Sequence, residues 1–126
     1  MDLPALSQVS DSLFLPLLCR VIESRSAQPI IRDPQAEAIF EQLKPAFAAI
    51  DRPMYRQMLR GQLPRLMVVT VALRSRHFDR QAQTFAARHP EALIVNLGCG
   101  LDTRFQRLDD GKLNWLDLDY PEVIAL

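Results

Sequence analysis

The sequence predicts an α/β fold in which a helical N-terminal region leads into the first portion of a nucleotide-binding βαβ unit. The run 93–97 is apolar and of strand length, and it leads directly into the glycine pair Gly98 and Gly100. A second apolar run ends in an acid roughly 20 residues later, as nucleotide-binding βαβ units do. Helical spacing dominates the residues before these runs. We therefore expect a helical cap region over residues 1–90 and the start of a cofactor-binding domain over residues 91–126.

Composition limits the classes of partner. The chain has 126 residues, of which 48% are apolar and 24% charged, as in ordinary globular domains. Basic and acidic residues number 15 each, so no basic excess favours nucleic acid or an anionic membrane surface. Cys19 and Cys99 lack the spacing of a zinc site and predict free thiols. With no signal-like segment and no apolar run of membrane-spanning length, the expected class is a soluble, cytoplasmic protein without a metal.

Apolar doublets between Ser10 and Ser26 predict the first helix. They recur every four residues, which places them on one face for packing. Ser12 can cap this helix, and Pro16 is tolerated if it lies in the first turn, where a missing N–H costs nothing.

The dipeptide Asp33-Pro34 predicts a second helix, because aspartate caps free N–H groups and proline suits the first helical position. This helix should run to about Leu43 and be ended by Pro45. A short helix is expected over residues 54–60, closed by the glycine that follows.

The longest helix should open at Pro64 and extend to about Arg88. Its stripe of Leu66, Val69 and Leu73 is expected to face the core. β-branched residues in its N-terminal part leave a strand as the alternative there.

The glycine turn and the acids after it are the candidate ligand-binding residues. The run 93–97 is expected to be a strand buried on both faces, and the glycines after it allow a ligand to approach the backbone closely. Position 103, where dinucleotide-binding proteins carry a third glycine, is threonine, which favours a nucleoside without a pyrophosphate.

Two acids mark the end of the second predicted strand, residues 115–118. Asp117 or Asp119 can accept hydrogen bonds from both hydroxyls of a ribose. The alternative role for Asp119 is to cap the helix that opens at Pro121.

Several segments together resemble the leucine carboxyl methyltransferase family, in particular its branch of tetracenomycin-type polyketide O-methyltransferases. They are N-L-G-C-G-L-D-T-R at 96–104, L-D-Y-P-E-V-I at 118–124, Glu23-Ser24-Arg25, Arg32-Asp33-Pro34 and Arg74-Ser75-Arg76-His77-Phe78-Asp79. The resemblance covers nearly the whole chain. It implies the N-terminal part of an S-adenosylmethionine-dependent O-methyltransferase with a Rossmann-like sheet and a helical cap. The implied methyl acceptor is a carboxylate or hydroxyl of a small molecule or a peptide terminus.

The resemblance also implies roles for individual residues. The glycine loop, Gly98-Cys99-Gly100, would lie against S-adenosylmethionine. The acid matching Asp119 would hold the ribose, and the arginine matching Arg74 would pair with the methionine carboxylate. Asp102 is expected either to contact the cofactor or to cap the next helix.

The sequence indicates fewer residues for the methyl-acceptor site than for the cofactor site. The resemblance implies that Arg20 and Arg25 lie at the mouth of the substrate site, as the polar ends of N-terminal helices do in this family. Methyl transfer to an anionic oxygen needs no strong base, because alignment supplies much of the catalysis, so no catalytic acid or base is predicted.

Two strands do not make a stable sheet by themselves. We therefore expect either a fragment of a longer product or a natural truncation that covers its open strand edge with a second copy. In both cases this chain alone should be a poor enzyme. The second hypothesis for function is a non-catalytic, mainly helical interaction module that dimerises through that edge.

Overall fold

The computed structural model describes residues 11–126. In chain order, the elements are the 3-10 turn η1 (Asp11–Leu13), α2 (Phe14–Ser24), α3 (Pro34–Ala49), α4 (Pro53–Leu59), α5 (Arg65–Arg88), β1 (Leu93–Leu97), α6 (Arg104–Leu108), β2 (Asn114–Leu118) and α7 (Pro121–Ile124). Helices and a small parallel sheet thus make a mixed α/β structure.

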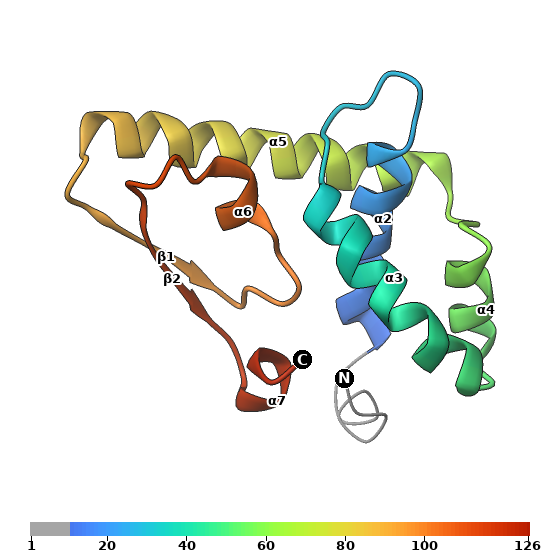
Figure 1. Cartoon of the computed structure of the whole chain (residues 1–126). Helices are drawn as coiled ribbons and strands as arrows, with labels where there is room; N and C mark the ends of the chain where they lie inside the picture. The colour runs from blue at the N-terminus through green and yellow to red at the C-terminus, as the bar shows by residue number, and fades with distance from the viewer. Residues whose placement is uncertain (1–10) are drawn as a thin grey trace.

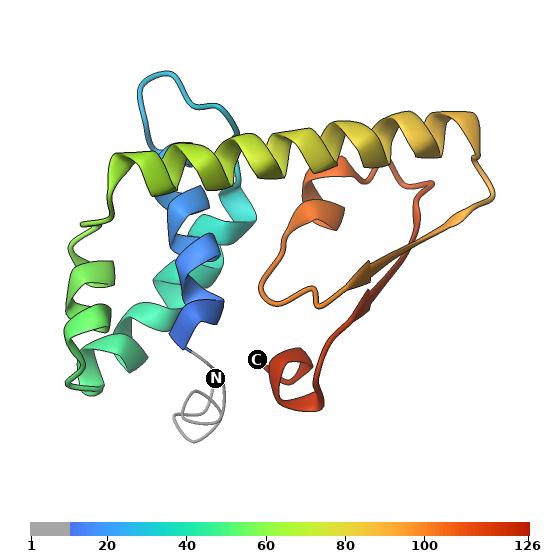
Figure 2. The same cartoon turned by 180° about the vertical axis from the view of Figure 1, so that it is seen from behind.

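Helix α5 runs along both parts of the molecule (Figure 1). The bundle of α2, α3 and α4 lies along its N-terminal half, while β1, β2 and α6 lie along its C-terminal half, as the view from behind also shows (Figure 2). Helix α2 packs against both α3 and α5, and α5 also contacts α6. Helix α5 therefore packs against the bundle at one end and against α6 at the other.

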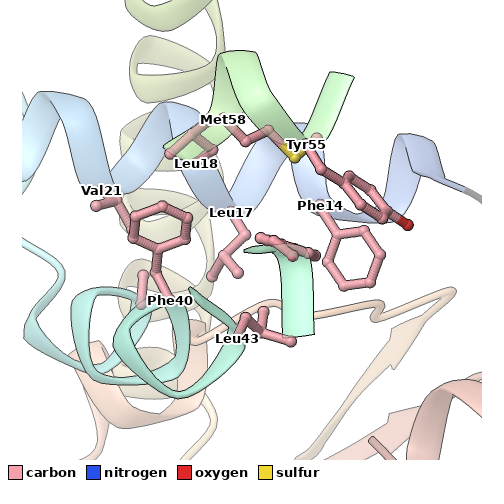
Figure 3. Packing of buried hydrophobic residues seen from close by; sticks show 10 residues of the cluster. Phe14, Leu17, Leu18, Val21, Phe40, Leu43, Tyr55 and Met58 are labelled. Atoms are coloured by element: carbon pink, nitrogen blue, oxygen red, sulfur yellow. The ribbon is translucent and has the colours of Figure 1, made fainter. Parts of the chain in front are cut away.

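The hydrophobic core lies between α2, α3 and α4 (Figure 3). Its buried side chains are Phe14, Leu17, Leu18, Val21, Ala36, Phe40, Leu43, Phe47, Tyr55 and Met58. The ring of Phe47 lies edge-on to Phe14 with centroids 5.0 Å apart, and its centroid is 4.6 Å from that of Tyr55. The apolar doublets of α2 supply one side of this core, as the sequence predicts.

The first helix begins later than predicted. Residues 11–13 form a 3-10 turn, α2 starts at Phe14, and Leu13 rather than Ser12 occupies the cap position. Such turns are frequent at helix N-termini. Pro16 lies in the first turn of α2, the position at which a proline is tolerated. Ser10 lies outside the described residues.

Helix α3 starts as predicted but ends later. Asp33 caps it, its Oδ1 accepting a hydrogen bond from the Ala36 N–H at 3.0 Å. The predicted end at Pro45 is wrong, because the helix continues to Ala49. A proline inside a helix removes one hydrogen bond, yet the extra turn carries Phe47 into the core, where it is 2% exposed. Burial of this ring offsets the local cost.

Gly61 ends α4 as predicted. Its φ of +64° is the left-handed conformation that glycine adopts without strain. The Gly61 N–H donates to the Met58 carbonyl and the Gln62 N–H to the Gln57 carbonyl, both at 3.0 Å. These two bonds form the Schellman motif, which satisfies the last carbonyls of the helix.

Residues 65–88 form one continuous helix, so the prediction of a helix is confirmed and the strand alternative is wrong. The face of α5 that is buried differs from the predicted one. Leu66 is 79% exposed and Leu73 43% exposed. The buried positions are instead Val68, Ala72, Ser75 and Asp79. Small side chains let α5 approach α2 closely, and the Asp79 carboxylate can be buried because arginines of α6 pair with it. Apolar residue type alone does not reveal such a face.

Strands β1 and β2 pair in parallel, in a register from Leu93 with Asn114 to Leu97 with Leu118. The prediction that β1 is buried on both faces is wrong for the described residues, since Leu93 is 55% exposed and Leu97 is 75% exposed. Ile94 and Asn96 between them are half-buried. A parallel strand is buried on both faces only when other elements cover both faces, and within residues 11–126 only one face of β1 is covered.

Candidate functional site

A cleft of about 670 Å³ lies between α2, α5 and the loop that follows β1. Its lining consists of Leu13, Pro16, Leu17, Arg20, Arg74, Ser75, Phe78, Asn96, Leu97, Gly98, Cys99, Gly100, Leu101, Asp102 and Arg104. The structure therefore brings together Arg74, Gly98, Cys99, Gly100 and Asp102, which the sequence singles out. Asp119 is not part of the lining.

The glycine loop depends on its glycines for its shape. Gly98 has a φ of +62° and Gly100 a φ of +54°, conformations that side chains disfavour. The N–H groups of Gly98 and Cys99 both donate to the Leu118 carbonyl, at 2.7 and 3.2 Å. The loop is thereby tied to the end of the neighbouring strand.

Asp119 is hydrogen-bonded to this loop. Its Oδ2 accepts a hydrogen bond from the Gly100 N–H at 2.8 Å, and its Oδ1 accepts one from the Tyr120 N–H at 2.7 Å. Tyr120 is the cap residue of α7 and no side chain caps that helix, so the capping role considered for Asp119 is wrong. Because a carboxylate has about four acceptor positions, about two remain on Asp119 for other donors.

Asp102 is held by side chains. It lies 2.6 Å from Nη1 of Arg104, and its Oδ2 accepts a hydrogen bond from Nδ2 of Asn96 at 3.3 Å. Thr103 is the cap residue of α6, and no side chain caps that helix. The capping alternative for Asp102 is therefore wrong, and its carboxylate lines the cleft.

Arg74 differs from the other arginines of the cleft. Arg20 pairs with Asp33 at 2.9 Å, and Arg104 pairs with Asp79 and Asp102. Arg74 is exposed and has no acidic partner within residues 11–126. Its guanidinium is thus available for an anion in the cleft.

Arg25 does not line the cleft. It forms surface ion pairs with Glu37 at 3.1 Å and with Glu41 at 2.8 Å, on the side of α2 that meets α3. Arg20 does line the cleft, but it is buried and paired. Only Arg20 of this predicted pair therefore lies at the site.

The cysteines are unsuited to nucleophilic chemistry. Burial raises the pKa of the Cys99 thiol, and the negative charges of Asp117 and Asp119 raise it further. Burial also raises the pKa of Cys19, against the opposing charges of Arg20 and Arg74. Both thiols are free, as predicted, and they stay protonated near neutral pH, whereas the thiolate is the reactive form.

A cluster of buried and half-buried charged side chains next to the glycine loop is the feature that the sequence does not predict. We define it as Arg20, Asp33, Asp79, Asp102, Arg104 and Arg107, three acids and three arginines within the described chain. Oδ2 of Asp33 accepts from Nε of Arg20, Nη1 of Arg107 and the Thr103 hydroxyl, at 2.9, 2.7 and 2.6 Å. In the sequence, Arg20, Asp33 and Asp102 indicate other roles and Thr103 argues only against a pyrophosphate, so no signal in the sequence predicts that these residues meet.

Hydrogen bonding outweighs burial at Asp33. Burial alone would raise the pKa of this carboxyl. The hydrogen bonds from Thr103 and the Ala36 N–H, together with the charges of Arg107 and Arg20, outweigh it and hold the pKa below its ordinary value. The carboxylate is therefore ionised at neutral pH.

Two kinds of feature are absent from the part of the chain that the structure describes. Across residues 11–126, no helix has both the length and the apolar character that crossing a membrane requires. Over the same part of the chain, His, Cys, Asp and Glu side chains do not gather in groups of three or more that could hold a metal ion.

The family model and the similar proteins found by comparison agree with one another. The family model for leucine carboxyl methyltransferase matches residues 14–126. The tetracenomycin polyketide synthesis O-methyltransferase TcmP of Streptomyces glaucescens is 32% identical over 122 residues, which are 96% of this chain and 41% of that protein. The S-adenosyl-L-methionine-dependent methyltransferase dpfgK of Gibberella zeae is 27% identical over 125 residues, 96% of this chain and 40% of that protein.

The chain spans about two fifths of the length of these curated relatives. No solved structure matches it.

Proposed function

Because the chain belongs to the leucine carboxyl methyltransferase family, we propose that it forms the cofactor-binding part of an S-adenosylmethionine-dependent O-methyltransferase. The observation that carries the proposal is Arg74, an arginine without an acidic partner among residues 11–126, in a cleft whose other wall is the glycine loop. The methyl acceptor is a carboxylate or hydroxyl of a small molecule or a peptide terminus. In this proposal β1 and β2 begin a Rossmann-like sheet over residues 91–126, and residues 1–90 form its helical cap.

The residues present fit this cofactor. The Arg74 guanidinium can bind the methionine carboxylate through two parallel hydrogen bonds. Gly98 and Gly100 leave the loop backbone without side chains toward the nucleoside, and Asp119 keeps about two acceptor positions for ribose hydroxyls. Cys99 and Asp102 complete the loop side of the cleft.

In this proposal the residues of this chain bind the cofactor and orient it toward the methyl acceptor. S-adenosylmethionine, when bound, supplies a methyl group on a positively charged sulfur, an activated donor. We assign no acid or base, because an anionic acceptor oxygen needs none, and alignment of donor and acceptor accounts for much of the rate.

Isothermal titration of S-adenosylmethionine into the protein that contains this chain tests the proposal. Arg74→Ala should weaken binding about 10- to 100-fold, because hydrogen bonds to charged groups contribute about 1.5–3 kcal/mol. Arg80→Ala is the matched control, since Arg80 is exposed on the same helix and does not line the cleft. Absence of binding by the wild-type protein contradicts the proposal, and equal affinity of the two variants contradicts the role of Arg74.

The exposed face of β1 favours a second candidate function. Leu93, Val95 and Leu97 form an exposed apolar row, and a non-catalytic interaction module would cover it and its open strand edge by forming a homodimer. Light scattering combined with the same titration separates the candidates. A dimer that does not bind S-adenosylmethionine supports the module, whereas a monomer that binds it excludes the module.

A further inference from the structure

We propose that Asp33 is a positioning residue for the glycine loop and that, through Thr103 and Arg20, it sets the affinity of the cleft for its cofactor. The inference rests on the proposed function for the identity of the ligand. It concerns a residue that does not line the cleft and acts only through its neighbours.

Asp33 is itself rigidly held. Its Oδ1 accepts from the Ala36 N–H at 3.0 Å, and its own N–H donates to Oγ of Ser24 at 3.0 Å. The side chain is fully buried. It is therefore a fixed point between α2 and α3.

From this point two connections reach residues 101–103, which directly follow the glycine loop. The Thr103 hydroxyl donates to Oδ2 of Asp33 at 2.6 Å. Arg20 donates from Nε to the same oxygen at 2.9 Å and from Nη2 to the Leu101 carbonyl at 2.5 Å. Leu101 and Thr103 flank Asp102, so both sides of this cleft residue are tied to Asp33.

Helix capping alone does not account for this arrangement. Capping uses only Oδ1, and serine or asparagine caps a helix about as well as aspartate. Oδ2 is engaged by donors from the loop and from α2 and α6. Buried ion pairs contribute little net stability because desolvation is costly, whereas a role in fixing one arrangement is documented for buried polar groups. The geometry thus favours positioning over stability as the role of Oδ2.

Thr103→Val tests the connection, because valine keeps the shape of threonine and lacks the hydroxyl. The variant should speed amide hydrogen exchange over residues 98–104 in the ligand-free protein. It should also raise the dissociation constant for S-adenosylmethionine about tenfold, within the range expected when a buried acceptor loses a donor. Thr103→Ser retains the hydroxyl and should behave as wild type in both measurements.

Tyr55→Phe is the control for a purely structural effect. It also removes a buried hydroxyl that donates to a carboxylate, here to Asp11 at 2.6 Å, and Tyr55 does not line the cleft. It should lower the melting temperature but leave loop exchange and cofactor affinity unchanged. Thr103→Val overturns the inference if it behaves in the same way.

A second variant is available if Thr103→Val does not fold. Arg20→Lys retains the positive charge beside Asp33 but lacks the second donor for the Leu101 carbonyl, so loop exchange should again rise; unchanged exchange overturns the inference. The two readouts also separate the proposals. Failure of the wild-type protein to bind S-adenosylmethionine contradicts the proposed function, while loop exchange still decides whether Asp33 positions the loop.

Discussion

The side-chain hydroxyl of Thr103 donates a hydrogen bond to Oδ2 of Asp33 at 2.6 Å, although 70 positions separate the two residues. The contact joins the N-terminus of α3 to the loop that follows β1. Arg20 and Arg107 donate to the same oxygen. The helical bundle and the start of the sheet therefore meet at one buried carboxylate.

Acid should destabilise the fold through Asp33. The ordinary pKa of this carboxyl is 3.8, and folding lowers it. The ionised form of Asp33 therefore contributes stability that is fully present above about pH 4 and is lost as the pH falls through the lowered pKa of the folded chain. Urea unfolding at a series of pH values from 7 to 2.5 should show this loss.

Two variants test whether Asp33 is the group responsible for the loss of stability in acid. Asp33→Asn should be less stable at pH 7 by about 3–5 kcal/mol, because it leaves the buried Arg20 without its carboxylate partner, and it should lose less stability on acidification. Asp109→Asn removes an exposed carboxylate and should follow wild type. An acid loss in Asp33→Asn equal to that of wild type assigns the effect to other groups.

Asp119→Asn should weaken S-adenosylmethionine binding about tenfold, because the amide offers fewer acceptor positions than the carboxylate that already holds the Gly100 N–H. Asp117→Asn is the matched control. Asp117 lies inside β2, two residues before Asp119, and its Oδ1 accepts from the side chains of Asn96 and Trp115. Titration calorimetry of both variants distinguishes the two acids, and a larger effect at Asp117 would reverse their assignment.

Gly100→Ala should cost more stability than Gly111→Ala. Both glycines have positive φ, +54° and +85°, so alanine is strained at either by about 1–2 kcal/mol. At Gly100 an added Cβ would also lie 2.9 Å from Cδ1 of Leu13, whereas at Gly111 it meets nothing within 4 Å. Urea unfolding measures the difference, and adding Leu13→Ala to Gly100→Ala should remove the excess strain. Equal losses for the two glycines mean that the Leu13 side chain moves aside without cost.

Local signals in the sequence predicted the local structure. The cap at Asp33, the stop at Gly61 and the turn at Gly98 each depend on residues within a few positions, because capping bonds and positive φ are properties of short segments. Strand lengths and the parallel start of the sheet followed from apolar runs and the glycine turn. Where distant packing decides, prediction failed: Phe47 in the core carries α3 past Pro45.

The buried face of α5 was equally beyond local reasoning. Leu66 and Leu73 are the more apolar candidates, yet Asp79 is buried because Arg104 and Arg107 pair with it from another helix. A carboxylate can be buried only where partners satisfy it, and those partners follow it by 25 and 28 positions.

The sequence by itself thus determined the order of elements, the glycine turn and, through a family resemblance, the residues expected around a cofactor. Only the tertiary structure decided that Arg74 lies in the same cleft as the loop, that Asp119 accepts a hydrogen bond from the Gly100 N–H, and that Asp33 accepts one from the Thr103 hydroxyl. The physical reason is distance along the chain. Hydrogen bonds and ion pairs form over about 3 Å in space, and the packing of α2, α3 and α5 brings these distant residues within that reach.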